Sequence, residues 1–279
     1  SAIRAHPLRR EIIATQMTNR VVDLLGMTFV HRSIRDTGAT TLEVVRAALI
    51  ALEALDVAGL EARLEQAARA VPGSVELDAL DALVGSVEGV VRWMLLNDLS
   101  GVEVESFVSA YRGPLAAVRS QLSELLPTPE RRRFASEVKR ATRVGLPAEL
   151  ATELAALAYL PSAMGVGEVA QRTGTPLSEV GRLFFALGER LRLGWLRDHL
   201  RALPVADAWS TIAVGGLVMD LRQVQRDLTE RYVRARADEP KLAVDAFLQR
   251  TPNVIRRYDD AIARIEADEA LSLASAGVV

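Results

Sequence analysis

The sequence contains no cysteine, only two lysines, and few aromatic side chains, which make up 5% of its 279 residues. Without cysteine the chain cannot form a disulfide, ligate zinc or an iron–sulfur cluster through sulfur, or use a thiol nucleophile. The lysines are Lys139 and Lys241, and the other 32 of the 34 cationic side chains are arginines. Any chemistry that requires a lysine therefore has only these two candidates.

Long apolar runs and an excess of either charge are also missing. The longest stretch without a charged residue, Leu154 to Gly167, has 14 residues and contains Pro161, whereas a membrane-spanning helix needs about 20 apolar residues. The net charge of -2 indicates no electrostatic attraction to nucleic acid or anionic lipid. No basic-then-apolar signal peptide opens the chain. We therefore expect a cytoplasmic protein without a nucleic-acid or membrane partner.

Alanine and leucine are abundant, with 42 and 39 residues, and this composition favours helix over sheet. Apolar residues recur at intervals of three and four along most of the chain, which places them on one face of a helix. Examples are the sets Leu42, Val45, Leu49, Leu52, Leu55; Leu77, Leu80, Val84, Val87, Val91, Met94; Leu217, Leu221, Val224, Leu228, Tyr232; and Ile255, Tyr258, Ile262, Ile265. The pattern predicts an all-α protein.

Helix start and stop signals divide this pattern into about ten helices, which we expect to form a multi-helix bundle with short Gly/Pro connections. Thr40 and Glu43 form a capping-box pattern, and Thr251 precedes Pro252 as a cap residue before a proline. Glycines and prolines mark the expected breaks: Gly26, Gly59, Pro72, Gly101, Gly113–Pro114, Pro127, Gly145–Pro147, Pro161, Gly174, Pro204 and Pro240.

The segment Leu126–Pro129 is the best candidate for a domain boundary. It predicts an N-terminal helical lobe over 1–126 and a C-terminal helical lobe over 127–270 packed on it, followed by a tail, 271–279, that we expect to fray. The chain begins with Ser1-Ala2 and not with methionine. We therefore expect it to be part of a longer protein.

Candidate catalytic residues are sparse. His199 follows Asp198 and could act as an acid–base pair with it, but a surface or packing histidine explains the same pattern without a nucleophile nearby. The carboxylates of 259–269 interleave with Ile262 and Ile265, which is typical of a solvated helix face, with Asp260 and Arg264 spaced for an ion pair. There is no nucleotide-binding glycine motif. We predict no catalytic, cofactor-binding or metal-binding residue in this chain.

Residues 166–187 read as a helix, a Thr-Gly turn and a second helix, a pattern that resembles a DNA-binding helix-turn-helix. The second helix begins with Pro176 and carries Glu179 in its first turn, where a carboxylate would repel phosphate. It continues with Phe184-Phe185, which favour a core. A structural hairpin is the preferred interpretation, and a stand-alone DNA-binding regulator is the alternative.

Several ordered motifs resemble the C-terminal region of the large-subunit NAD-specific glutamate dehydrogenases of bacteria. They cover nearly the whole chain, and the set is more specific than any one piece. The motifs are Arg10–Gln16, Gly26–Val30, Thr37–Ala39, Val91–Asn97, Gly188–Leu191, Gly194–Leu196, Leu203-Pro204, Trp209 and Met219–Arg226.

The resemblance implies a parent enzyme that oxidises L-glutamate with NAD to 2-oxoglutarate and ammonia, or runs the reverse. It also implies that catalysis depends on a glycine-flanked lysine, an aspartate and a Rossmann-type domain. Neither Lys139 nor Lys241 is glycine-flanked, so the chain is expected to need no cofactor itself, with NAD implied only for the parent.

The expected role is scaffolding: packing on the catalytic region of the same polypeptide and supporting a homo-oligomer. The near-heptad stripe from Leu217 to Tyr232 could pair within or between subunits. An independent enzyme that uses His199 and Asp198 is a further alternative.

Overall fold

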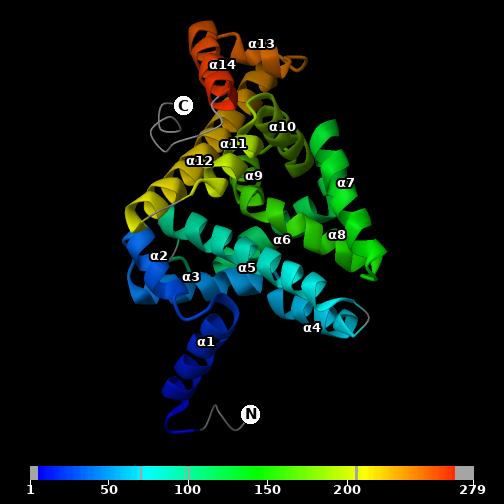
Figure 1. The fold of residues 1–279 in the computed structure, drawn as a ribbon. Coiled ribbons are helices and arrows are strands. Elements are labelled where there is room, and N and C mark those ends of the chain that lie inside the picture. The colour runs from blue at the N-terminus through cyan, green and yellow to red at the C-terminus, as the bar shows by residue number, and fades with distance from the viewer. Residues whose placement is uncertain (1–5, 70, 98, 100, 205–206, 268–279) are drawn as a thin grey trace. The chain divides into compact units, whose positions relative to one another are not determined.

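The computed structural model describes residues 6–69, 71–97, 99, 101–204 and 207–267, and the regular elements in these ranges are helices (Figure 1). The predicted all-α class is confirmed. The predicted tail, 271–279, lies outside the described residues. The elements are α1 (Arg9–Leu25), α2 (Phe29–Thr37), α3 (Thr41–Ala54), α4 (Val57–Ala68), α5 (Gly73–Leu96), α6 (Val104–Leu125), α7 (Thr128–Arg143), α8 (Ala148–Ala156), the 3-10 turn η2 (Leu157–Tyr159), α9 (Leu160–Thr173), α10 (Leu177–Arg190), α11 (Leu193–Ala202), α12 (Ala208–Asp238), α13 (Val244–Leu248) and α14 (Pro252–Ala267).

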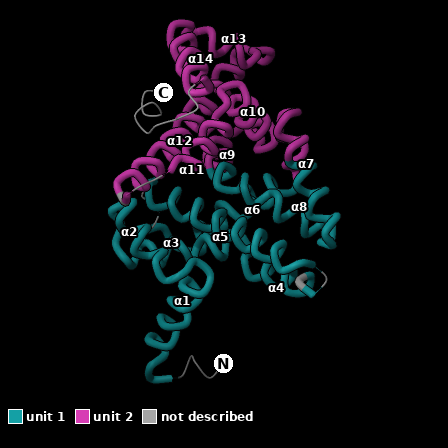
Figure 2. The backbone as a smooth tube through the Cα atoms, in the orientation of Figure 1, with its two compact units in different colours: residues 1–120, 134–164 teal, residues 121–133, 165–279 magenta. Residues whose placement is uncertain are grey.

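The chain divides into two compact units, each made of two segments (Figure 2). Unit 1 comprises residues 1–120 and 134–164, and unit 2 comprises residues 121–133 and 165–279. The boundary expected from Leu126–Pro129 lies inside a segment of unit 2. A proline-rich connection shows where a helix stops, whereas unit membership depends on which side chains pack together.

Unit 1 is built around α3 and α5, which contact each other extensively. On α3, Ala47, Ala48 and Ala51 are fully buried, and their small side chains allow neighbouring helices to approach closely. Trp93 of α5 and Tyr111 of α6 meet edge to face, with ring centroids 5.5 Å apart. Through these contacts, the alanine-rich helices of unit 1 form a tightly packed core.

Unit 2 is built around the long helix α12, which has 31 residues and contacts α10, α11 and α13. Asp207 caps α12 by accepting a hydrogen bond of 2.7 Å from the backbone N–H of Ser210. From α10, Phe184 and Phe185 are both buried. The helix pattern from Leu217 to Tyr232 therefore lies at the centre of unit 2.

The predicted helix ends are confirmed at several positions. Thr40 and Glu43 form a complete capping box at the start of α3. Gly26, an expected break, follows the last residue of α1 and has φ +82°, a conformation that favours glycine. Pro252 is the first residue of α14, directly after Thr251.

The break expected at Gly113–Pro114 is wrong, because both residues lie inside α6, whereas Gly59 and Pro161 lie in the first turns of α4 and α9, next to helix starts. A proline inside a helix removes one backbone hydrogen bond and crowds the preceding turn. In α6 the residues that follow, Leu115 and Val118, are buried. The packing of this face outweighs the local preference for a break.

The helical hairpin predicted over 166–187 is confirmed. Helix α9 ends at Thr173, Gly174 turns the chain with φ +67°, and α10 begins at Leu177. On α10, Leu183, Phe184 and Phe185 are buried. The second helix of the hairpin therefore presents its apolar face to the core.

The helical stretch Ala148–Thr173 has 26 residues and, by length and composition alone, could cross a membrane. Charged residues lie toward its two ends, at Glu149, Glu153, Glu168 and Arg172, so the stretch without a charged residue is shorter than the helical stretch itself. Within its most apolar window, 67% of the residues are buried inside the protein, as expected of a core helix.

Candidate functional site

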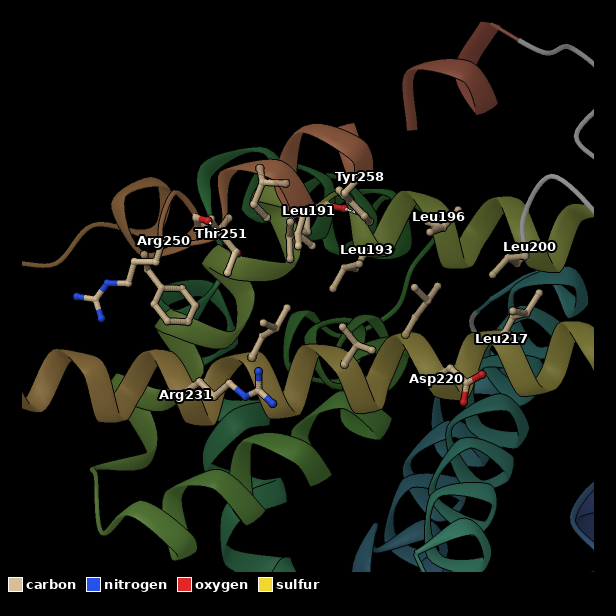
Figure 3. Close-up of a pocket in the computed structure, with 17 residues that line it drawn as sticks. Leu191, Leu193, Leu196, Leu200, Leu217, Asp220, Arg231, Arg250, Thr251 and Tyr258 are labelled. Carbon is tan, nitrogen blue, oxygen red and sulfur yellow. Dashed lines mark hydrogen bonds between the residues drawn. The ribbon is translucent and has the colours of Figure 1, made fainter. Parts of the chain in front are cut away.

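An apolar cavity of about 600 Å³ lies within unit 2, between α11, α12, α13 and α14 (Figure 3). We call it the α12 cavity. Leu217, Leu221, Val224 and Leu228 of α12 form one side of it. Their spacing of four, three and four residues places them on one face of the helix, which is the stripe recognised in the sequence.

The opposite walls come from shorter helices. Leu193, Leu196 and Leu200 of α11 face α12, with Leu200 opposite Leu217 in Figure 3. Phe247 and Leu248 of α13, followed by Val254, Ile255 and Tyr258 of α14, complete the lining. Volumes of a few hundred Å³ with mostly apolar linings are typical of small-molecule sites.

The stripe on α12 ends at Tyr232, which packs against Phe247 with ring centroids 4.8 Å apart. The Tyr232 hydroxyl donates a hydrogen bond of 2.8 Å to the carbonyl of Leu242. Tyr232 is buried, whereas Val224 in the middle of the stripe is 48% exposed. The stripe therefore pairs inside unit 2 at its end and faces the cavity along its middle.

Arg190, the last residue of α10, holds both outer walls of the cavity. Its Nε donates to Asp245 of α13 at 2.7 Å, and its two terminal nitrogens donate to Asp259 of α14 at 3.2 Å each. These bonds to Asp259 and Asp245 raise the pKa of Arg190 above its ordinary value. A bidentate guanidinium fixes direction as well as distance, so Arg190 orients α13 and α14.

Tyr258 attaches α14 to the connection between α10 and α11, because its hydroxyl donates to the carbonyl of Leu191. Burial raises the pKa of Tyr258 to about 12, with the nearby Asp259 acting in the same direction. The hydroxyl is therefore neutral at physiological pH and acts as a donor. Arg192 follows with φ 53° and places its guanidinium 4.5 Å from the ring centre of Trp195.

Next to the apolar stripe, α12 is joined to α10 and α11 by a buried amide. Gln225, 2% exposed, donates from Nε2 to the carbonyl of Phe184 at 2.9 Å and accepts from Arg197 at 2.9 Å. A Cβ placed on Gly188 would lie 2.4 Å from Gln225 Nε2. Only glycine fits at position 188 while this amide keeps its place.

Two further polar groups lie beside this amide. Arg226 of α12 pairs with Glu168 of α9 at 3.0 Å. Burial lowers the pKa of the Arg197 guanidinium, and the nearby Arg201 acts in the same direction. The contacts of Arg226 and Arg197 connect α12 to α9 and α11.

Glu130, at the start of α7, is a half-buried carboxylate in unit 2. Its Oε2 is buried and has no hydrogen-bond partner among the described residues. Burial raises the pKa of Glu130, and the nearby Glu189 raises it further, although Arg197 opposes both effects. The charged form of Glu130 therefore costs free energy in the folded protein.

His199 and Asp198, the candidate acid–base residues from the sequence, each contact a neighbouring side chain of α11. His199 is exposed and lies against the ring of Trp195, 4.2 Å between centroids, while Asp198 pairs with Arg201 at 3.6 Å. Among the described residues, no hydrogen bond joins Asp198 to His199, and each side chain has a different neighbour.

The carboxylates near the C-terminus are also used in structural pairs. Asp259 binds Arg190, and Glu266 binds Arg192 at 2.6 Å. The Asp260–Arg264 pair expected from i,i+4 spacing does not occur among the described residues. Pairing across helices replaces pairing along one helix here. In the described ranges, no group of three or more His, Asp and Glu residues is arranged to hold a metal ion.

The α12 cavity itself was missed by sequence reasoning. The sequence shows the apolar stripe on α12, but the spacing of its residues is the same whether a helix or an open space lies opposite it. Arg190 orients α13 and α14 through Asp245 and Asp259, and these two residues are 55 and 69 positions from Arg190 in sequence.

A family model described as "Glutamate dehydrogenase, C-terminal" matches residues 1–279. Among curated proteins, the chain is 29% identical to an NAD-specific glutamate dehydrogenase of Pseudomonas aeruginosa over 240 residues, which is 86% of this chain and 15% of that protein. It is 28% identical to the enzyme of the same description from Halomonas elongata, over 80% of this chain and 14% of that protein. For the Mycobacterium tuberculosis protein the identity is 27%, over 76% of this chain and 13% of that protein. The chain thus spans about a seventh of the length of these relatives.

The close approach at Gly188 is tested by adding one methyl group. Gly188→Ala is expected to lower the free energy of unfolding by about 2 kcal/mol, because the new Cβ displaces the Gln225 amide. Urea denaturation followed by circular dichroism measures the change. Gly216→Ala in α12 is the control, since a Cβ there meets nothing within 4 Å and should stabilise the helix by about 0.5–1 kcal/mol. Equal effects of the two variants would contradict the assignment.

The buried carboxylate of Glu130 predicts a pH-dependent effect. A raised folded-state pKa means that the folded protein holds the proton more tightly than the unfolded chain, so stability falls as pH rises through that pKa. Glu130→Gln should therefore increase the free energy of unfolding at neutral pH. The increase should disappear below pH about 4, where glutamate is protonated in both states.

Urea denaturation at both pH values measures this difference, with Glu137→Gln as the control because Glu137 is exposed and pairs with Arg140. A loss of stability in Glu130→Gln at neutral pH would show that attraction to Arg197 outweighs the cost of burial.

Proposed function

The chain belongs to the glutamate dehydrogenase C-terminal family, and we propose that it is the non-catalytic helical C-terminal domain of a larger NAD-specific glutamate dehydrogenase polypeptide. The observation that carries this proposal is the family match over all 279 residues in a chain that spans only about a seventh of its relatives. The parent would interconvert L-glutamate and 2-oxoglutarate with NAD in the cytoplasm, and other parts of that polypeptide would supply the catalytic residues.

The positions of the lysines support a non-catalytic role. Lys139 and Lys241 are both exposed, on α7 and before α13. The resemblance to the family implies that a catalytic lysine is flanked by glycine, and neither of these two lysines is. The exposure of His199 and the pairing of Asp198 with Arg201 also support a non-catalytic role.

A scaffolding role is supported by apolar side chains that unit 1 leaves uncovered. On α1, Val21 and Leu25 are buried, but Ile13 and Met17, one turn apart, are 44% and 41% exposed, and Leu8 before the helix is 57% exposed. Exposed apolar surface of this kind is typical of a contact with another protein segment. In our proposal the α1 face contacts the catalytic region of the same polypeptide or a second subunit of a homo-oligomer.

A stand-alone DNA-binding regulator is the alternative, and the packing of α10 argues against it. The helix that would read DNA buries Leu183, Phe184 and Phe185, and Glu179 lies in its first turn. A retarded band in a gel-shift assay at low salt, weakening as salt is added, would support the alternative.

Catalytic independence is tested with the purified chain. We expect no reduction of NAD in the presence of L-glutamate and no NAD binding by calorimetry, because the catalytic lysine and cofactor domain implied by the family lie elsewhere. The full-length polypeptide serves as the positive control. Turnover by the purified chain alone would contradict the proposal.

The scaffolding role is tested on the full-length polypeptide with Met17→Asp. A charge in the α1 face should weaken its contact with another segment, so the assembled enzyme should dissociate or unfold at a lower temperature. The purified 279-residue chain should change by less than about 0.5 kcal/mol, since Met17 is exposed there.

Gln16→Asp is the matched control, because Gln16 is also exposed on α1 and polar. Size-exclusion chromatography and thermal denaturation measure both variants. An enzyme whose assembly and melting are the same in Met17→Asp and the wild type would exclude the α1 face as the contact.

A further inference from the structure

The lining of the α12 cavity is elongated along α12. From Leu217 to Arg231 its α12 side extends over 14 residues, which is about 21 Å at the rise of an α-helix. One end is closed by Leu196 and Leu200, which pack with Val218 in the local hydrophobic core. The other end is bounded by α13. The shape suits a flexible linear molecule better than a globular one.

The middle of the cavity offers a ligand almost no unpaired polar group. The Tyr258 hydroxyl donates to the carbonyl of Leu191, and the Thr251 hydroxyl donates to the carbonyl of Leu248. A buried water needs two to four polar partners, so water is held poorly between the leucine side chains. Displacing it with hydrocarbon is favourable.

Charge is distributed unequally along the cavity. Arg231 and Arg250 lie at the end formed by α13, and Asp220 lies near the end marked by Leu217 (Figure 3). Arg250 pairs with Glu239 at 2.6 Å, whereas Arg231 is exposed and forms no ion pair within the described ranges. Arg231 is therefore the cation available to an anionic group at this end.

We propose that the α12 cavity binds an amphiphilic anion with a long unbranched hydrocarbon chain, of the fatty-acid class. The carboxylate lies at Arg231, and the chain follows Leu228, Val224 and Leu221 toward Leu200. A partner helix fits less well, because Leu200 and Leu217 meet at one end and would have to separate to admit a body about 10 Å wide.

The experiment uses the purified, delipidated chain and the fluorescent fatty acid cis-parinarate. Palmitate is expected to displace the probe, and octanoate should need at least about tenfold higher concentration because its shorter chain buries less apolar surface. Palmityl alcohol, which has the same chain without the charge, should bind about fivefold more weakly than palmitate. Failure of palmitate to displace the probe, or equal potency of octanoate and palmitate, would overturn the proposal.

Variants locate the site. Val224→Trp fills the cavity from a half-exposed position and should weaken palmitate binding by at least about tenfold. Val254→Trp, at an exposed position on α14, provides a second test if the first variant is poorly folded by circular dichroism. Unchanged affinity in a folded variant of either kind would place the ligand elsewhere and overturn the proposal.

The head-group position is tested by Arg231→Gln, which should remove the preference for palmitate over palmityl alcohol. Arg234→Gln is the matched control, because Arg234 is on the same helix, pairs with Glu230 at 2.8 Å and does not line the cavity. A preference that survives in Arg231→Gln, or is lost equally in both variants, would overturn the assignment of the carboxylate to Arg231.

Discussion

The close contact between α10 and α12 is the constraint on which the rest of unit 2 depends. Gly188 lies so near Gln225 that a single Cβ would displace the amide, and that amide joins the Phe184 carbonyl to the Arg197 guanidinium. A buried amide satisfied on both sides specifies one arrangement of helices, because any shift leaves a polar group unpaired. Helix α12 is therefore held by specific hydrogen bonds on a face that adjoins its apolar stripe.

The walls of the cavity that face α12 are also held by polar contacts. Arg190 directs α13 and α14 through Asp245 and Asp259, and Tyr258 ties α14 to Leu191. These bonds orient α13 and α14, which also pack against α12 through Phe247 on Tyr232 and through Ile262 and Ile265 beside Val218. Where walls are fixed in this way, the facing leucines need not fill the space between them. The same design explains how one stripe can be buried at Tyr232 and open at Val224.

Much of the fold was predictable because helix formation is read from local signals. The 3–4 spacing of apolar residues, the Thr40–Glu43 capping box and the turn at Gly174 each act within a few residues, and all three are confirmed. The break expected at Gly113–Pro114 is wrong because burial of Leu115 and the residues after it supports α6 through the proline. Local preference predicts a helix end only where tertiary packing does not oppose it.

By itself, the amino-acid sequence determined the helical class, the amphipathic stripes, the hairpin around Gly174 and the absence of cysteine chemistry, because each depends on residue type and short-range spacing. Only the tertiary structure decided that Asp259 forms an ion pair with Arg190, that Gly188 lies against the Gln225 side chain, and that the stripe on α12 faces a cavity. These relations join residues up to 69 positions apart, and no periodicity along the chain records which helices meet.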